Sequence, residues 1–309
     1  MALRRKKQAP KLTLTVPLST SNLGPGFDAF SVAVEQEIKI SWEAAEKTEL
    51  VRKGALSESV LSVGGDPVLR GLKRAAILAN KKLPKGKVVV SSAIPPGRGL
   101  GASGAGIVGG LLLGNQICNG NIKTELLHRE AIQLEGHPEN ATGSFLGGSH
   151  WSVQDPRGYW FHTPFPLHRD LRFLFILPPY PLSTKRAREV LPSSVSFQRA
   201  AAQARRTPIL LEGLRTLDER AIQTGIQDEL HVEARLRQLT GAKGLLKFAV
   251  RSGGIAATLS GAGSALLVLT RTGRMSDVEA RLKRRVKRLW GESGSVIRSR
   301  VQPQAATFQ

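Results

Sequence analysis

The chain has 309 residues, 41% of them hydrophobic and 22% charged, which is a typical composition for a globular protein with one large or two medium domains. Its single cysteine, Cys118, excludes an intrachain disulfide and a zinc site of the cysteine type, and it predicts a cytoplasmic location. The net charge of +21 would suit a nucleic acid or an anionic substrate as partner.

The sequence gives no signal for a membrane segment. The longest apolar run, residues 106–113, is far shorter than the roughly 20 residues that a membrane helix needs. The basic start MALRRKKQAP is followed by the alternating pattern KLTLTV, without a hydrophobic core of signal-peptide length. We therefore expect an untargeted protein with no membrane partner.

The first half of the chain predicts strands followed by helices. Alternating apolar residues indicate strands at 11–16, 30–34 and 38–42, with a loop over residues 17–28. Asp66 followed by Pro67 predicts the start of a helix that runs to about Lys82. The elements expected next are a strand over 87–93, a glycine loop, a helix to about Cys118, a helix from about Thr124 to just before Gly136, and a turn at HPEN, residues 137–140.

The second half predicts further strands and helices. The composition changes over residues 155–170, which predicts a connection between two domains, 1–165 and 166–309. The elements expected after it are a strand over 171–177, a short helix capped by Ser183 or Thr184, helical patterns to about Phe248, and two strands around the turn GAG at 261–263. The whole is a mixture of helices and strands in two parts.

Basic residues are densest near the end of the sequence. Residues 271–300 hold ten basic and three acidic side chains. Ser276 and Glu279 predict a capping box for a helix in this segment, whose apolar residues, including Leu289, recur at helical spacing. Because no nucleic-acid motif accompanies the charge, we interpret it as the solvent face of a helix, and we do not expect a nucleic-acid partner.

The stretch IPPGRGLGASGAG, residues 94–106, is rich in glycine and follows an apolar strand pattern. It matches GxGxxG formally, but IPPGR separates it from the strand, and both GxxxxGK[ST] and GxSxG are absent. Glycines let backbone N–H groups surround an anion, while a following helix directs its positive dipole end at the same point. From this stretch alone, phosphate binding and a flexible loop before a packed helix both stay open.

Four motifs in order carry a family resemblance. They are PLSTSNLGPGFD (17–28), the glycine loop, EGHPEN (135–140) and LSGAGSALL (259–267). Together they resemble the GHMP kinase superfamily, and EGHPEN followed by LGG is most similar to the homoserine kinases. The resemblance implies an α+β fold of two domains, the first ribosomal-protein-like with a left-handed βαβ crossover and the second ferredoxin-like, and commonly a homodimer.

The resemblance also implies a reaction and its cofactors. It implies transfer of the γ-phosphoryl group of ATP to the side-chain hydroxyl of L-homoserine, a step of threonine biosynthesis, with Mg²⁺. The residues expected to hold the nucleotide are Pro96, Gly97, Arg98, Gly99, Leu100, Gly101, Ala102, Ser103 and Gly104. Ser103 matches a serine on the magnesium side, and Glu135 matches the acid that completes the metal site. Ala102 replaces the usual serine, and without the resemblance Glu135 would be read as an acid on a helix surface.

For the amino-acid substrate the resemblance implies residues from several motifs. They are Asn22, Asp28, His137, Asn140, Arg188, Arg235 and Gly261, of which Asn22, Asp28 and Asn140 are the expected catalytic residues. Asp28 is expected to hold the ammonium group, and the arginines suit a carboxylate because a guanidinium binds it in bidentate fashion. The N–H groups of Gly261 and Gly263 are expected to face the substrate. Arg235 lies in DELHVEAR, where the Glu-Pro-Tyr of the family pattern is lost.

Several alternatives stay open at this level. Taken singly, the arginines could be surface residues, and Asn22 and Asp28 could stabilise a turn. The chain could be a kinase of the same superfamily for another small alcohol, or a basic binding protein without catalysis on the same fold. No lysine is placed for a catalytic role, and a dedicated general base is not expected. The glycines of residues 104–114 predict either tight helix packing or a soft helix.

Overall fold

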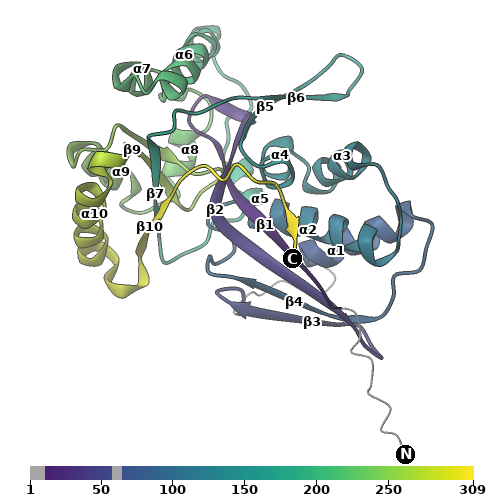
Figure 1. The fold of residues 1–309 in the computed structure, drawn as a ribbon. Helices are drawn as coiled ribbons and strands as arrows, with labels where there is room; N and C mark the ends of the chain where they lie inside the picture. Colours follow the sequence, from purple (N-terminus) through teal and green to yellow (C-terminus); the bar gives the residue numbers. More distant parts are fainter. Residues whose placement is uncertain (1–10, 58–64) are drawn as a thin grey trace, which may run out of the picture.

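Two β-sheets organise the molecule, and helices pack against each of them (Figure 1). The computed structural model describes residues 11–57 and 65–309, so the basic start MALRRKKQAP lies outside the described residues. The strand order is β11-β1-β2-β4-β3 in the first sheet, with β5 and β6 continuing from β2, and β10-β7-β9-β8 in the second. The predicted mixture of helices and strands in two parts is confirmed.

Two long antiparallel strands form the centre of the first sheet. Its strands are β1 (Lys11–Asn22), β2 (Gly26–Ala44), β3 (Glu49–Gly54), β4 (Gly86–Ser92), β5 (Ser149–Gln154), β6 (Trp160–Pro164) and β11 (Thr307–Phe308). β3 and β4 are parallel, and the chain between them passes through α1 (Pro67–Leu78), which makes a βαβ unit. The left-handed crossover of this unit stays a prediction.

The loop expected over residues 17–28 is mostly strand, so this prediction was wrong. β1 continues through Pro17 to Asn22 with bulges, and the two strands expected within residues 30–42 are one strand, β2. The reason lies in tertiary contacts, because small polar residues of β1 are buried against hydrogen-bonding partners from distant parts of the chain. Ser19 Oγ donates to Asn140 Oδ1 at 3.0 Å, and Thr20 Oγ1 lies 2.9 Å from Ser260 Oγ. A pattern of apolar alternation cannot detect such a strand.

Four helices cover one face of the first sheet (Figure 1). They are α1, α2 (Ala102–Ile117), α3 (Thr124–Glu135) and α4 (Pro138–Leu146). The predicted cap of α1 is confirmed, since Asp66 Oδ1 accepts from Val68 N at 2.9 Å, although the helix ends at Leu78 and not at Lys82. The turn predicted at HPEN is wrong, because Pro138 occupies the first turn of α4.

The glycines of α2 let it approach α1 until their backbones touch. A Cβ on Gly110 would lie 2.2 Å from Val68 O, and a Cβ on Gly71 would lie 2.4 Å from Ile107 O. Gly109, on another side of α2, faces Ile40 of the sheet. Of the two options left open by the sequence, tight packing is therefore the correct one.

The substitution Gly110→Ala is expected to lower the free energy of unfolding by about 3 kcal/mol, because the added methyl group collides with backbone that cannot turn away. Gly244→Ala is the matched control: Gly244 lies in α9 (Ala242–Arg251), and a Cβ there meets nothing within 4 Å. The control should be neutral or more stable by up to about 1 kcal/mol. Urea unfolding of the three proteins measures both effects, and equal stability of Gly110→Ala and wild type would contradict the packing.

The second sheet is built from later parts of the chain. Its strands are β7 (Leu171–Leu177), β8 (Ala256–Leu259), β9 (Leu266–Arg271) and β10 (Ser295–Ser299). The helices of this half are α5 (Thr184–Glu189), α6 (Phe197–Thr216), α7 (Glu219–Gly225), α8 (Val232–Leu236), α9 and α10 (Met275–Trp290), with short 3₁₀ turns η2 (Thr272–Arg274) and η3 (Gly291–Ser293). The strand expected over 171–177 and the cap of α5 by Ser183 are confirmed.

The segment 301–309 returns from the second sheet to the first (Figure 1). Gly148 N donates to Gln302 O at 2.7 Å, Gln302 N donates to Ala33 O at 2.9 Å, and β11 pairs with β1. The strand β6 lies within the stretch expected as a domain connection. The boundary between 165 and 166 stays a prediction, and residues 301–309 belong in space to the first sheet.

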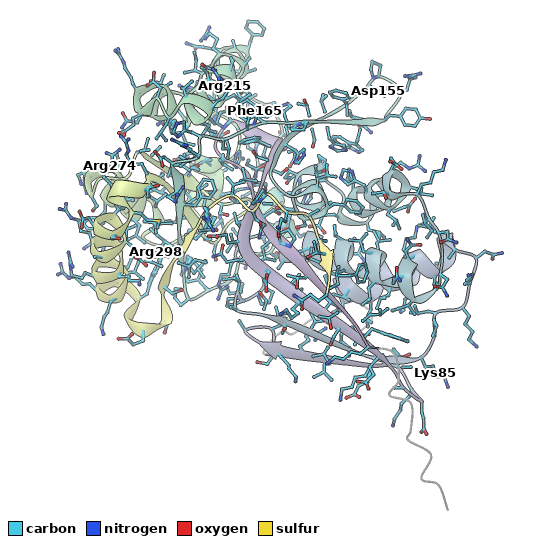
Figure 2. All side chains as sticks on the ribbon, viewed as in Figure 1. Lys85, Asp155, Phe165, Arg215, Arg274 and Arg298 are labelled. Atoms are coloured by element: carbon cyan, nitrogen blue, oxygen red, sulfur yellow. The ribbon has the colours of Figure 1, made fainter. Side chains whose placement is uncertain are left out.

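The outer face of α10 carries the basic residues near the end of the sequence. Val278, Leu282 and Val286 are buried, while most of the helix's arginines and lysines are exposed, and Figure 2 shows side chains projecting outward along this helix. The predicted capping box is wrong, because the Glu279 carboxylate binds Arg298 and Lys283 instead. Leu289 is also 41% exposed and so does not belong to the apolar stripe. Among the described helices, none combines the length and the apolar character required to cross a membrane.

Two histidines join the β5–β6 hairpin to the helices of the first half. The rings of His128 and His162 lie 4.6 Å apart, Thr142 Oγ1 is 3.1 Å from His128 Nε2, and Ser152 Oγ is 2.8 Å from His162 Nδ1. Burial, followed by the neighbouring histidines, lowers the pKa of His128 to about 3, and burial and His150 lower the pKa of His162 to about 4. Both side chains are therefore neutral near pH 7.

This cluster predicts a loss of stability in acid. Between pH 6.5 and pH 3 the unfolded chain binds a proton at His128 that the folded protein excludes, so the contribution is complete above pH 6.5 and declines as the pH falls. His128 alone should remove about 2 kcal/mol between pH 7 and pH 5. The variant His128→Gln keeps a polar partner for Thr142 but does not titrate, so its stability loss over the same interval should be smaller by that amount in urea unfolding. An identical pH dependence in both proteins would contradict the prediction.

Candidate active site

A cavity of about 800 Å³ lies where loops of the two halves meet. Its walls come from the end of β1, the glycine loop, the starts of α2, α4 and α5, and the turn between β8 and β9. Every residue predicted from the sequence for the nucleotide, the substrate or the metal lines this cavity except Gly104 and Gly261. The structure therefore brings together residues that the sequence separates by more than 200 positions.

The carbonyl groups at the centre of the glycine loop, residues 97–100, are bound to the protein. Four consecutive carbonyls accept hydrogen bonds: Gly97 O from Leu182 N at 3.0 Å, Arg98 O from Ala265 N at 3.2 Å, Gly99 O from Ser260 Oγ at 2.6 Å and Leu100 O from Ser19 N at 3.2 Å. Within the described part of the chain, the N–H groups of residues 97–104 donate to no group. This arrangement leaves a row of donors available to an anion, at the positive end of α2.

Two glycines in this loop are required by their surroundings. Gly99 and Gly101 have φ values of 66° and 65°, in the left-handed region that favours glycine. A Cβ on Gly99 would lie 2.1 Å from Ser260 O, and a Cβ on Gly101 would lie 2.4 Å from Ser19 Oγ. The loop is held on both sides by β1 and by the β8–β9 turn, which does not fit the alternative of a flexible loop before a packed helix.

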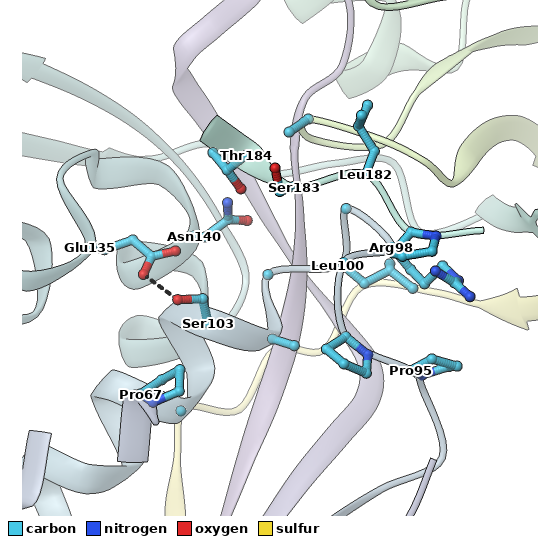
Figure 3. A pocket seen from close by; sticks show the side chains of 18 of the residues that line it. Pro67, Pro95, Arg98, Leu100, Ser103, Glu135, Asn140, Leu182, Ser183 and Thr184 are labelled. Carbon is cyan, nitrogen blue, oxygen red and sulfur yellow. Dashed lines mark hydrogen bonds between the residues drawn. The ribbon is translucent and has the colours of Figure 1, made fainter. Parts of the chain in front are cut away.

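Ser103 and Glu135 meet at the N-terminal end of α2. Ser103 Oγ donates to Glu135 Oε2 at 2.8 Å (Figure 3). Glu135 is the last residue of α3, and its burial raises the pKa of the carboxyl above its usual range, against the opposing charge of His137. A hydroxyl and a carboxylate are the oxygen donors that Mg²⁺ accepts, and Mg²⁺ commonly takes one or two protein ligands together with phosphate oxygens. In residues 11–57 and 65–309, no three acidic, histidine or cysteine side chains form a metal site of their own.

His137 lies between two carboxylates. Its Nδ1 is 3.1 Å from Glu139 Oε1, and its Nε2 is 3.8 Å from Glu135 Oε1. Burial lowers the pKa of His137, but the hydrogen bond and charge of Glu139, together with Glu135, outweigh it and raise the pKa above the usual value. Glu139 was not among the residues expected at the site, although it lies in the cavity wall.

Asn140 is held at one end and directed into the cavity at the other. Its Oδ1 accepts from Ser19 Oγ, which leaves its Nδ2 donors for another group. Figure 3 shows Asn140 between the Ser103–Glu135 pair and the start of α5, where Ser183 and Thr184 line the cavity. Ser183 and Thr184 were predicted only as helix caps, because a capping hydroxyl and a ligand-binding hydroxyl look the same in a sequence.

The two polar residues of the first motif have different surroundings. Asn22 is 2% exposed, donates from Nδ2 to Gly261 O at 3.0 Å and accepts from Asp28 N at Oδ1 at 3.0 Å. Asp28 forms a bidentate ion pair with Arg188, at 2.8 and 2.9 Å, and the side chains of both are about one third exposed, 33% and 37%. The hydrogen bond and charge of Asp28 raise the pKa of Arg188. Asn22 thus orders the loop, while Asp28 and Arg188 face the cavity.

Arg235 is buried behind this pair. It is 2% exposed, its Nε donates to Ala187 O at 3.1 Å and its Nη1 to Gly261 O at 3.3 Å, and burial lowers its pKa to about 10. Phe27, which sequence reasoning missed, lies beside both arginines, with its ring centroid 5.8 Å from Arg188 Cζ and 5.2 Å from Arg235 Cζ. The only signal for Phe27 was its place next to Asp28 in the motif.

The third motif departs from its predicted role. The N–H group of Gly261 donates to Ser21 O at 3.1 Å, and that of Gly263 donates to Ser260 O at 2.9 Å. Both donors are therefore used within the protein, which does not fit the prediction that they face the substrate. Gly261 instead ties Asn22 and Arg235 together through its carbonyl oxygen.

This fold is that of the GHMP kinases. Residues 69–148 match the family model for the GHMP kinases N terminal domain. Among solved structures, the fold is similar to a homoserine kinase from Cytophaga hutchinsonii, with a TM-score of 0.85 and 21% identity over all of both chains. It is also similar to L. major mevalonate kinase in complex with R-mevalonate, with a TM-score of 0.70 and 13% identity over 98% of each chain. The predicted fold class is confirmed.

Relatives with similar sequences show to which family of GHMP kinases the chain belongs. The homoserine kinase of Thermosynechococcus vestitus is 31% identical over 257 residues, which cover 83% of this chain and 85% of that protein. The homoserine kinase of Desulfitobacterium hafniense is 31% identical over 265 residues, 85% of this chain and 88% of that protein. The chain belongs to the homoserine kinase family.

Proposed function

We propose that this protein transfers the γ-phosphoryl group of ATP to the side-chain hydroxyl of L-homoserine, giving O-phospho-L-homoserine for threonine biosynthesis. The names of its relatives support this substrate. The observation that carries the proposal is that one cavity joins a row of backbone N–H donors, which bond no described group, to the partly exposed ion pair of Asp28 and Arg188. The first suits a polyphosphate and the second an amino acid, so the cavity matches both reactants.

The nucleotide end is proposed at the glycine loop. The N–H groups of residues 97–104 and the positive end of α2 would bind the phosphates. Apolar residues of the same cavity give a surface against which an adenine base can pack: Ile38, Leu56, Val90, Pro95 and Pro67. Pro96, Arg98 and Ala102 line the cavity beside the phosphate donors and complete the proposed nucleotide site, with Gly104 inside the first turn of α2.

The metal is proposed beside the phosphates. Ser103 and Glu135 would hold Mg²⁺, and their two oxygen atoms, 2.8 Å apart, fit its preference for oxygen ligands. When bound, Mg²⁺ neutralises charge on the phosphate oxygens during transfer. His137 is proposed to balance the charges of Glu135 and Glu139 around this site.

The acceptor end is proposed at the opposite wall. The Asp28 carboxylate would bind the ammonium group, and the guanidinium groups of Arg188 and Arg235 would bind the carboxylate. Asp28 and Arg188 bind each other in the structure. A zwitterionic amino acid would replace this ion pair by two, one between its ammonium group and Asp28 and one between its carboxylate and Arg188. Asn140 Nδ2 is proposed to orient the reacting hydroxyl, while Asn22 and Gly261 position the loops.

Catalysis in this arrangement depends on positioning and charge. The row of N–H donors and the dipole of α2 stabilise negative charge on the transferred group, and the fixed walls place the hydroxyl in line with it. Asn140 cannot accept a proton, and Asp28 is engaged with cations, so we propose that no side chain of the cavity acts as a dedicated general base.

The test is ADP release with Mg·ATP over a panel of acceptors: homoserine, threonine, serine, mevalonate and galactose. Turnover with homoserine far above the others is the expected result. Turnover with a different alcohol would assign another kinase of the superfamily. No turnover with any acceptor, combined with salt-sensitive nucleic-acid binding, would favour the basic binding protein instead.

Three further features of the working protein are proposed. We propose a cytoplasmic location, which suits the single buried Cys118, and a homodimer, which light scattering would detect. We also propose the domain boundary at residues 165 and 166, with the first part holding most of the nucleotide site and the second supplying Arg188 and Arg235.

A further inference from the structure

A buried histidine lies directly behind Arg235. His231 is 1% exposed and lies one helical turn before Arg235, at the start of α8. Asp228 fixes this turn, because its Oδ2 accepts from the backbone N of Leu230, His231 and Val232 at 3.1, 2.6 and 2.7 Å. The turn therefore presents His231 and Arg235 on one side, toward the loop of the first motif.

The hydrogen bonds of His231 admit only one tautomer. Its Nε2 lies 3.0 Å from Gly24 O and 3.6 Å from Asp228 Oδ1, and both of these oxygens can only accept, so Nε2 carries the hydrogen. Its Nδ1 lies 3.0 Å from Arg235 Nη1, and a guanidinium can only donate, so Nδ1 must be the free lone pair. His231 is thus neutral and is both donor and acceptor at once.

The same histidine connects Arg235 to the first motif. Its ring stacks on Phe27 with centroids 4.9 Å apart, and Phe27 in turn lies beside Arg188 and Arg235. Gln203 of α6 supports the arrangement from behind, since its Nε2 donates to Pro25 O at 3.1 Å and to Asp228 Oδ1 at 3.0 Å. The turn at Gly24, just before the strand of Asp28, and the helix that carries Arg235 are therefore held to each other through His231.

We propose that His231 is a positioning residue for the acceptor site: as the Nε2–H tautomer it orients the Arg235 guanidinium toward the carboxylate of the amino-acid substrate and fixes it against the turn at Gly24 that precedes Asp28. This inference rests on the proposed function, because it needs Arg235 to bind the acceptor. His231 touches neither reactant; it acts through Arg235 and Gly24.

The arrangement also predicts a pH dependence. Protonation of His231 would place a hydrogen on Nδ1, facing the Nη1 donor of Arg235, and would remove the acceptor. The charged groups that face His231 are Asp228 on its own turn, Arg235 on α8 and Asp28 at the start of β2. Burial lowers the pKa of His231 and outweighs the carboxylates, so the neutral form persists below the usual range of histidine. The KM for homoserine should rise only in acid, once this group protonates.

Two substitutions test the two hydrogen bonds of the His231 ring one at a time. His231→Asn keeps an acceptor near Nδ1 for Arg235 and loses the bond to Gly24, whereas His231→Gln keeps a donor near Nε2 for Gly24 and loses the acceptor. His231→Gln is expected to raise the KM for homoserine about tenfold or more, with kcat and the KM for ATP within about threefold of wild type. For His231→Asn, kcat, the KM for ATP and the KM for homoserine are all expected to stay within about threefold of wild type. Its KM for homoserine should no longer rise in acid.

Other outcomes decide against the inference. Equal effects of both variants on the KM for ATP and on thermal stability would show a merely structural role and overturn it. A ligand-independent measurement separates its failure from failure of the proposed function: ¹⁵N NMR of the histidine rings at pH 6 should show His231 as neutral Nε2–H. A protonated ring or the Nδ1–H tautomer would overturn the positioning role, even if homoserine is turned over. If NMR shows the neutral Nε2–H ring but the protein does not phosphorylate homoserine, the tautomer of His231 is confirmed and only the proposed substrate is contradicted.

Discussion

Replacing Glu135 by glutamine is expected to lower kcat/KM for phosphoryl transfer at least about 100-fold, which is the effect of removing one charged or hydrogen-bonding group from a transition-state site. The carboxylate accepts the Ser103 hydroxyl at 2.8 Å beside the phosphate donors of α2. A neutral amide keeps the size of the side chain but supplies a weaker ligand for Mg²⁺. The loss should therefore appear in kcat and in the Mg²⁺ concentration needed for half-maximal rate, with the KM for homoserine changed less.

The matched control is Glu125→Gln, the same chemical change on an exposed residue in the first turn of the same helix α3. The control should keep wild-type kinetics, and both variants should unfold at similar temperatures. If Glu135→Gln retained wild-type kcat at every Mg²⁺ concentration, the metal site would have to lie elsewhere. Ser103→Ala provides a second check, and it should shift the Mg²⁺ requirement in the same direction.

The substitution Asp28→Asn is expected to raise the KM for homoserine about 10- to 100-fold, the range for a lost hydrogen bond to a charged group. An amide cannot neutralise the ammonium group of the substrate, and it cannot accept both hydrogen bonds of Arg188 that the carboxylate accepts at 2.8 and 2.9 Å. The KM for ATP should stay near wild type, because among the described residues Asp28 bonds Arg188 and Asn22 and no group of the glycine loop. Initial rates at varied homoserine and saturating Mg·ATP measure the effect.

Asp277→Asn, on the exposed face of α10, is the control and should leave all constants unchanged. The pattern of the kinetic constants also decides a question of mechanism. A collapse of kcat with an unchanged KM would mean that Asp28 accepts the proton of the reacting hydroxyl, in contradiction to a mechanism without a dedicated base.

The fold could be predicted from the sequence where a local pattern decides the structure. Asp66 with Pro67, the apolar run of β7 and the glycine after α3 each act through their immediate neighbours, and each prediction is confirmed. The second half of β1 could not be predicted, because its buried hydroxyl groups depend on Asn140 and Ser260, more than 100 residues away. The capping box at Ser276 failed because the helix already begins at Met275, and because Arg298, which is distant in the sequence, binds the Glu279 carboxylate.

In the candidate site, too, some residues could be predicted from the sequence and others could not. Motifs identified sixteen residues that line one cavity, because a family pattern records positions directly. The residues that support them were missed. Phe27, Glu139 and His231 have no distinctive spacing. The contacts of Phe27 with His231 and the arginines exist only after segments from both halves meet, while the contacts Glu139–His137 and His231–Arg235 are local but follow no pattern that a sequence displays. The roles predicted for the N–H groups of Gly261 and Gly263 failed because a sequence does not show which donors the protein itself uses.

The path of the chain has a consequence for how the molecule is made. Residues 301–309 pair with β1 and contact β2 and the end of α4, although they are synthesised after the whole second sheet. During synthesis from the N-terminus, the first half therefore emerges with one flank of β1 uncovered, and this flank stays uncovered until residues 301–309 have been made. An uncovered strand edge is a place where chains aggregate. Removing residues 301–309, or fusing another protein directly after residue 300, should therefore reduce the soluble yield in cells. The activity of the molecules that do fold should fall less.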